Sequence, residues 1–177
     1  MPPPSINMKK WIIAFTAIAL AGCGEEPPKT LNEISKSVVD VSTLKLEGAE
    51  ALVFGLKPDF GYDNSTYFFM ATEEANRILP KLVKYFPDQK PDQVVFTLNS
   101  TLVDKYGNES KAPVIQLAFN MTDIQKINYE KGQFTSWDLL GLSNIEFLHP
   151  AGASIVREYC AGENNAEYAA AFCSRFI

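Results

Sequence analysis

The 177-residue sequence predicts an α+β fold, in which a sheet that contains an antiparallel hairpin is packed by a few helices. Apolar and polar residues alternate over residues 94–102 and again over 115–121, and turn-forming residues occupy 104–108 between them. This is the pattern of two strands joined by a turn. A helical stripe precedes the hairpin, and strands and helices do not alternate strictly, which favours α+β over a parallel α/β sheet.

The segments before the hairpin are predicted in chain order. Residues 31–47 fit either a helix at their start or a strand at their end, and 51–54 are typical of a buried strand. The Gly-, Pro- and Asx-containing stretch 55–65 predicts a loop, and 67–70 is again strand-like. Thr72 then caps the clearest helix of the chain. The apolar stripe of this helix consists of Ala75, Ile78, Leu79, Leu82, Val83 and Phe86.

Further short elements are expected within and after these segments. Pro80 lies inside the predicted helix and indicates a kink or a late start. Thr122 and Gln125 form a capping-box pattern that predicts a short helix after the hairpin. Residues 137–142 are expected to form a helical turn and 145–148 a short strand. Elements of this number and size suit one globular domain, which we expect over residues 31–177.

Cys160 and Cys173 are expected to form a disulfide between a pair of C-terminal helices. Apolar residues at helical spacing end at Gly162, and a second helix is predicted after it, so a tight turn can bring the two sulfurs together. An even pair of cysteines in an exported protein usually forms a disulfide. Two buried free thiols are the alternative, and a redox-active pair is disfavoured because the C-x-x-C motif is absent.

The N-terminal segment has the features of an export signal. Lys9 and Lys10 precede an apolar run over residues 11–20, which is too short to span a bilayer as a helix. The run ends in Leu20-Ala21-Gly22-Cys23, an aliphatic residue followed by two small residues and a cysteine. Over about residues 8–24 the sequence therefore resembles a bacterial lipoprotein precursor with its lipobox. The resemblance covers only this segment and implies nothing about the fold of the rest.

The resemblance implies that residues 1–22 are a cleaved signal peptide and that Cys23 carries the lipid. The membrane is then a partner through that lipid, and residues 23–30 form a lipidated tether. Gly24 rather than an aspartate follows the cysteine, which by resemblance implies the periplasmic face of the outer membrane. The alternative is a conventional signal peptide in which the cysteine is incidental.

The start of the sequence does not fit such a signal. Residues 1–7 contain three consecutive prolines, and Met8 stands immediately before the basic pair. We expect translation to start at Met8, which makes residues 1–7 a misassigned start. Removing residues 1–22 removes two lysines and no acidic residue, so the formal net charge changes from −5 to −7. An acidic domain is not attracted to anionic lipid, so the lipid itself is the expected attachment.

Composition and motifs exclude several functions from the prediction. The negative net charge of −5 argues against a nucleic-acid partner. One histidine and a bridged cysteine pair leave too few ligands for a transition metal, the Asx residues of 59–64 lack the spacing of a calcium loop, and no cofactor motif is present. His149 has no accompanying nucleophile motif, so no catalytic residue is assigned. The runner-up hypothesis is a small envelope hydrolase that uses acidic residues or His149.

The favoured function is binding or scaffolding of an envelope protein rather than catalysis. Phe60 and Tyr62 are the candidate partner contacts, because both rings lie in the predicted loop and not in an alternating strand that would bury them. A lipid tether would raise the local concentration of such a domain near its partner. A small-molecule carrier is a third possibility, and it would need a sizeable apolar cavity.

Overall fold

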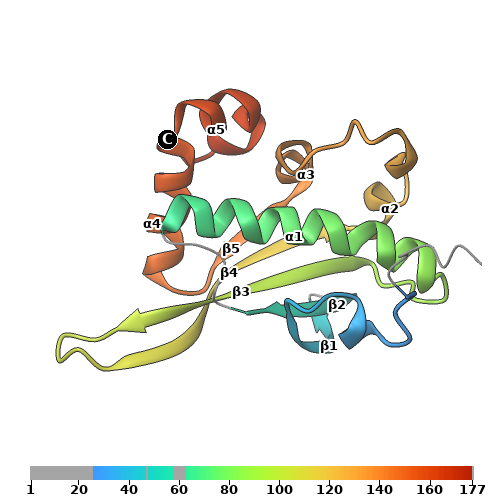
Figure 1. Ribbon diagram of the computed structural model, residues 1–177, viewed down its shortest axis with the longest axis horizontal. Coiled ribbons are helices and arrows are strands. Elements are labelled where there is room, and N and C mark those ends of the chain that lie inside the picture. The colour runs from blue at the N-terminus through green and yellow to red at the C-terminus, as the bar shows by residue number, and fades with distance from the viewer. Residues whose placement is uncertain (1–25, 47, 58–62, 177) are drawn as a thin grey trace, which may run out of the picture.

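A computed structural model describes residues 26–46, 48–57 and 63–176 as a five-stranded sheet with its helices gathered on one side (Figure 1). Cys23, Phe60 and Tyr62 lie outside the described residues. The strands are β1 (Val38–Leu46), β2 (Ala49–Leu56), β3 (Gln93–Val103), β4 (Glu109–Asn120) and β5 (Asn144–Phe147). The helices are η1 (Leu31–Glu33), α1 (Asn64–Tyr85), α2 (Met121–Ile124), η2 (Tyr129–Lys131), α3 (Ser136–Leu142), α4 (Pro150–Ala161), α5 (Glu163–Tyr168) and α6 (Ala170–Cys173).

The sheet is mixed, and its strands lie in the order of the chain, β1-β2-β3-β4-β5. Neighbouring strands are antiparallel except for β2 and β3, which are parallel and are joined by α1. The α+β class is thereby confirmed, and so is the antiparallel hairpin, which is β3–β4. The register of β4 slips by one residue, because Leu98 pairs with Ile115 while Asn99 pairs with Pro113. Val114 is the extra residue of this bulge.

The main core lies between the sheet and the helices. Alternate residues of the three central strands face it, and Phe54 of β2 stacks on Phe96 of β3 with ring centroids 5.5 Å apart. The intervening residues of the same strands form a second apolar cluster, whose members are Ala51, Val53, Val95 and Ala118. Because successive side chains of a strand point to opposite faces, this second cluster belongs to the sheet face turned away from α1.

The long helix begins earlier than the sequence pattern predicts. Asp63 is the N-cap of α1, so Tyr67 to Met70 are helical and not a strand, and Thr72 lies inside the helix. The Thr72 hydroxyl donates to the carbonyl of Phe68, 2.9 Å away, instead of capping. The predicted strand is wrong because this apolar run packs against the C-terminal helices. Such a tertiary contact overrides local propensity and leaves no periodic pattern in the sequence. The buried residues of α1 are Tyr67, Phe68, Ala71, Thr72, Glu74, Ala75, Ile78, Leu79 and Leu82.

The short elements match the sequence prediction to different degrees. In the ambiguous stretch 31–47, the start is the single turn η1 and the end is the strand β1. Thr122 does not cap a helix, since α2 begins at Met121 and its N-cap Asn120 makes no side-chain hydrogen bond. The predicted turn at 137–142 and strand at 145–148 correspond to α3 and β5. The second C-terminal helix is divided into α5 and α6.

Gly152 allows α4 to approach the sheet closely at the bulge. A β-carbon at this position would overlap the backbone carbonyl of Val114 and would lie 2.9 Å from Cγ1 of Ile115. That carbonyl accepts a hydrogen bond from Leu148 N, 3.0 Å away, so it is held in place. The packing of α4 therefore requires a residue without a side chain.

We expect Gly152→Ala to lower the free energy of unfolding by about 1–3 kcal/mol, because the added methyl group forces α4 away from the bulge. Gly141→Ala is the matched control, since a β-carbon there meets only Cβ of Ala171 at 3.9 Å. The control should be neutral or up to about 1 kcal/mol more stable through its higher helix propensity. Urea unfolding of both variants measures the difference, and equal stabilities would contradict this account of the close approach.

Candidate partner-binding surface

The predicted contact loop joins the described fold at the N-terminus of α1. Asp63 accepts hydrogen bonds from the backbone N–H of Thr66 at 2.8 Å and from the Thr66 hydroxyl at 2.9 Å. The backbone bond first, and the hydroxyl second, lower the pKa of the Asp63 carboxyl. Next to this cap, Asn64 donates through its Nδ2 to Oε1 of Glu158 on α4, 2.9 Å away. The first residues of α1 therefore lie beside α4.

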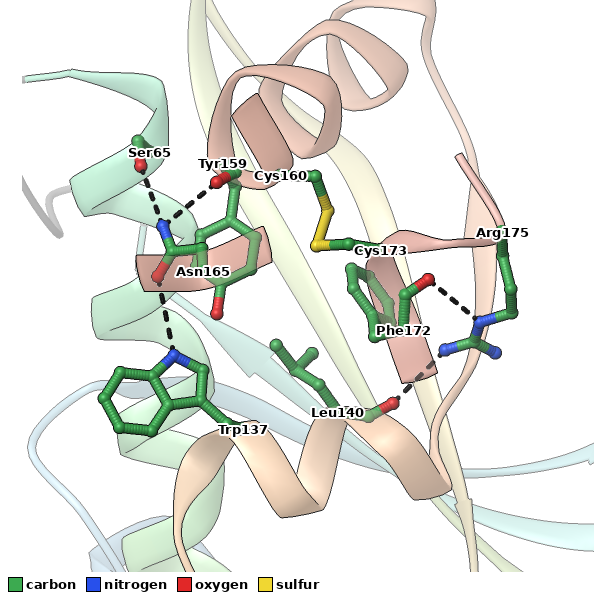
Figure 2. Close-up of a disulfide and its surroundings, with 9 residues drawn as sticks. All are labelled: Ser65, Trp137, Leu140, Tyr159, Cys160, Asn165, Phe172, Cys173 and Arg175. Atoms are coloured by element: carbon green, nitrogen blue, oxygen red, sulfur yellow. Dashed lines mark hydrogen bonds between the residues drawn. A yellow bond between two sulfur atoms is a disulfide. The ribbon is translucent and has the colours of Figure 1, made fainter. Parts of the chain in front are cut away.

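The disulfide between Cys160 and Cys173 is confirmed. It joins the end of α4 to α6 with a Cα–Cα distance of 5.4 Å, and both residues are buried. In Figure 2 the bridge is drawn between Tyr159 and Phe172, both of which are fully buried. Of the two helices that the bridge joins, α6 is only four residues long, so the covalent link holds it in place where its own helical hydrogen bonds are few.

Asn165 connects α5 to three other helices from within the loop that the disulfide closes (Figure 2). Its Nδ2 donates to the backbone carbonyl of Tyr159 on α4 at 3.0 Å and to Oγ of Ser65 on α1 at 3.5 Å. Its Oδ1 accepts from the indole N–H of Trp137 on α3 at 3.4 Å. One amide side chain thereby sets the position of α5 against the N-terminus of α1.

Three aromatic rings form a partly exposed surface beside this amide. Phe69 of α1, Trp137 of α3 and Tyr168 of α5 make up what we call the aromatic patch. The centroids of Trp137 and Tyr168 are 5.0 Å apart, and those of Phe69 and Trp137 are 6.1 Å apart. Tyr168 is 57% exposed, while the other two rings are half-buried. Rings in this position offer a rigid contact area that loses little entropy on binding.

Arg175 holds the C-terminal tail against α3, on the side of the disulfide away from Asn165 (Figure 2). Its Nη1 donates to the carbonyl of Ser143 at 2.8 Å, and its Nη2 to that of Leu140 at 3.2 Å. These carbonyls lie at the C-terminal end of α3, where a cation is favoured by the helix dipole. The guanidinium also lies 4.8 Å from the centroid of the Phe172 ring. The tail is thus fixed by both polar and cation–π contacts.

Tyr159 is a fully buried ring next to the disulfide. Its ring contacts Phe68 edge-on, with centroids 4.9 Å apart, and its hydroxyl makes no hydrogen bond with the described residues. Burial raises the pKa of this hydroxyl above its ordinary value. The polar N–H of the Trp137 indole lowers it without reaching hydrogen-bond geometry, and the charge of Glu73 raises it further. A buried hydroxyl without a partner lowers stability, which is why such groups are uncommon in folded proteins.

His149 and the acidic residues bear on the hydrolase hypothesis. His149 is exposed and serves as the N-cap of α4, because its Nδ1 accepts the backbone N–H of Ala151 at 3.1 Å. Pro150 follows at the first helical position, where a proline is favoured. Among the described residues, no three His, Cys, Asp or Glu side chains are grouped so that they could hold a metal ion. The hydrolase that uses acidic residues or His149 stays a prediction.

Glu74 is a buried carboxylate that the sequence pattern does not single out. It accepts a hydrogen bond from the Ser35 hydroxyl and pairs with Nη1 of Arg77 at 3.2 Å. This junction lines a hollow of about 290 Å³ between α1 and the segment that follows η1. Glu74 lies at i−4 to Ile78 on the buried stripe of α1, and an acid at such a position is the signal that could have identified it.

Two larger hollows flank the segment between α2 and η2. Their volumes are about 520 and 630 Å³, and Lys126, Ile127 and Asn128 line both. Both hollows open to solvent and carry charged side chains on their walls, including Lys84 in one and Asp138 in the other. Because both are open at the surface, neither is an enclosed cavity.

No protein-family model matches the chain, and comparisons with curated proteins and with solved structures also find no match. Within the part of the chain that the structure describes, no helix has the length and hydrophobicity to span a bilayer. The aromatic patch lies on an α+β domain whose C-terminal helices are joined by a disulfide.

We expect Tyr159→Phe to leave the free energy of unfolding within about 0.5 kcal/mol of the unmodified protein, or to raise it, because the substitution removes an unpaired hydroxyl. Tyr67→Phe is the matched control, since the Tyr67 hydroxyl donates to the carbonyl of Asn99 at 2.6 Å. Removing this donor should lower stability by about 1–2 kcal/mol. Denaturant unfolding compares the two. A larger loss for Tyr159→Phe than for Tyr67→Phe would show that the Tyr159 hydroxyl is satisfied.

Proposed function

We propose that this chain is a bacterial lipoprotein, held on the periplasmic face of the outer membrane by lipid on Cys23, and that its folded domain binds an envelope protein. The lipobox residues Leu20 to Cys23 support the anchor. The disulfide supports an oxidising compartment, since such bonds persist outside the cytosol. The aromatic patch is the single observation that carries the binding role.

The tether limits where the partner can be. Residues 23–30 include Pro27 and Pro28 and precede η1 directly. At about 3.3–3.6 Å per extended residue, this segment reaches roughly 25–30 Å. The domain then stays close to the membrane surface, and its partner must expose a complementary surface at the same depth. Confinement to that layer raises the effective concentration of the two proteins.

The aromatic patch suits a protein partner because of how it is built. Tyr168 presents more than half of its surface to solvent, while Trp137 behind it is fixed by Asn165. The rings come from three different helices, so the patch exists only in the folded, bridged domain. Exposed aromatic side chains with a rigid support are the residues that most often dominate a protein–protein interface. Phe60 and Tyr62 remain candidate contacts on sequence grounds.

We expect Cys23→Ala to abolish labelling of the chain by radioactive palmitate and to shift it from the membrane to the soluble fraction, because the thiol is the lipid acceptor. The double variant Cys160→Ala/Cys173→Ala is the control and should keep the label. Metabolic labelling in the host, followed by fractionation, measures both effects. Acyl label that persists in Cys23→Ala would refute the anchor.

A photoreactive amino acid at position 168 should produce a crosslinked adduct of defined mass in intact cells, because Tyr168 would lie in the interface. The control position is Tyr106, which is 77% exposed but lies outside the aromatic patch. Trp137→Ala, combined with the probe at 168, should lower the yield about tenfold, which is the typical loss for an interface aromatic. Equal yields at positions 168 and 106, or no adduct at 168, would refute the patch as the binding surface.

A further inference from the structure

The β3–β4 hairpin extends beyond the rest of the sheet as a two-stranded arm (Figure 1). The arm comprises residues 99–113. The parallel partner β2 ends where Leu56 pairs with Leu98, and β5 ends where Phe147 pairs with Ile115. Beyond these pairs, none of the described strands lies beside the outer edge of β4. A two-stranded ribbon is marginally stable alone, so an arm of this kind gains from another strand.

The register of the arm shows which backbone groups point outward. Asp104 N donates to the carbonyl of Asn108 at 2.9 Å, so these two residues form a hydrogen-bonded pair of the ladder. In an antiparallel ladder every second residue pair is hydrogen-bonded in this way, and the backbone groups of the pairs between point outward. Ser110, which pairs with Leu102, therefore bonds to β3. The N–H and C=O groups of Glu109 and Lys111 point away from β3 and are available to another strand. Pro113 has no N–H and ends this edge on the side of the domain.

The side chains on this edge have charges that match those of a second, antiparallel copy of the same edge. Glu109 and Lys111 are both exposed and lie on the same face of β4, two residues apart. When two identical edges pair antiparallel about Ser110, each Glu109 lies opposite a Lys111. Opposite charges in that position stabilise a strand pair, and like charges destabilise it. A lysine on an edge strand opposes pairing with most other strands, because its charge would be left uncompensated. A glutamate directly opposite compensates that charge.

We propose that the outer edge of β4 in the arm is a self-association surface, which pairs antiparallel with the same edge of a second copy, centred on Ser110. The Glu109–Lys111 pairs exchange backbone hydrogen bonds in both directions, and the two arms become one four-stranded ribbon. Val103, which is 64% exposed and pairs with Glu109, lies on the same face and gains a neighbouring strand. We assign the partner as a second copy of this chain, because Glu109 and Lys111 each meet the opposite charge when the edge pairs with itself. This proposal does not depend on the lipid anchor or on the aromatic patch.

The geometry allows a direct test by disulfide crosslinking. The two Ser110 residues face each other in a non-hydrogen-bonded pair, whose Cα atoms lie about 4.5 Å apart in antiparallel sheets. That distance suits a disulfide. The full chain with Ser110→Cys, purified in detergent and oxidised with copper phenanthroline, should form a covalent dimer on a non-reducing gel. Lys105→Cys is the control: the two arm tips would lie roughly 25 Å apart in this register, so it should give only background dimer.

Charge reversal tests the register. Glu109→Lys and Lys111→Glu, each combined with Ser110→Cys, should lower the dimer yield at least about tenfold, because each places like charges in two opposing pairs. Mixing the two variants before oxidation should restore the yield, since every opposing pair then joins a lysine of one chain to a glutamate of the other. Differently tagged chains identify the mixed dimer. Retention of the Cys160–Cys173 disulfide in each variant, checked by peptide mapping, confirms the fold.

Three results would overturn the proposal. The first is a Ser110→Cys yield no higher than that of Lys105→Cys. The second is a yield that charge reversal leaves unchanged or that mixing fails to restore. The third is efficient crosslinking of Leu102→Cys without crosslinking of Ser110→Cys, which would mean that the β3 edge pairs instead.

Discussion

The parallel pairing of β2 and β3 is the constraint on which the rest of the structure depends. Antiparallel neighbours can be joined by a tight turn, but parallel neighbours need a connection that returns across one face of the sheet. α1 makes that return, and its buried stripe covers the face that carries Phe54 and Phe96. The helices α3 and α4 then pack against α1 rather than over the other face. One strand pair thereby decides which side of the sheet holds the helices.

The same return places the N-terminus of α1 among the C-terminal helices. Ser65 contacts Asn165 there, and Phe68 packs against Tyr159 and Phe172. Helices as short as α5 and α6 have little stability of their own, so their positions depend on these contacts and on the disulfide. The aromatic patch is a product of that arrangement, because its three rings belong to helices that meet only when α1 crosses the sheet.

Residues with a long, regular pattern were predictable from sequence, and residues defined by tertiary contact were not. The hairpin β3–β4 alternates over two long segments, so its strands and their antiparallel pairing follow from period two. The start of α1 does not follow, because Tyr67 to Met70 form an unbroken apolar run without a distinctive period. The Cys160–Cys173 bridge was predictable from cysteine arithmetic. The pairing of Trp137 with Tyr168 was not, since it depends on where α3 and α5 meet.

The position of Phe172 and Cys173 has a consequence for the order of folding. Both residues belong to the main core together with strands and helices from the first half of the domain. The core therefore lacks part of its packing until residue 173 has left the ribosome. An incomplete chain exposes Phe68 and Tyr159, which contact Phe172 in the finished fold. The core can close only after residue 173 has been synthesised, and until then these two rings stay uncovered.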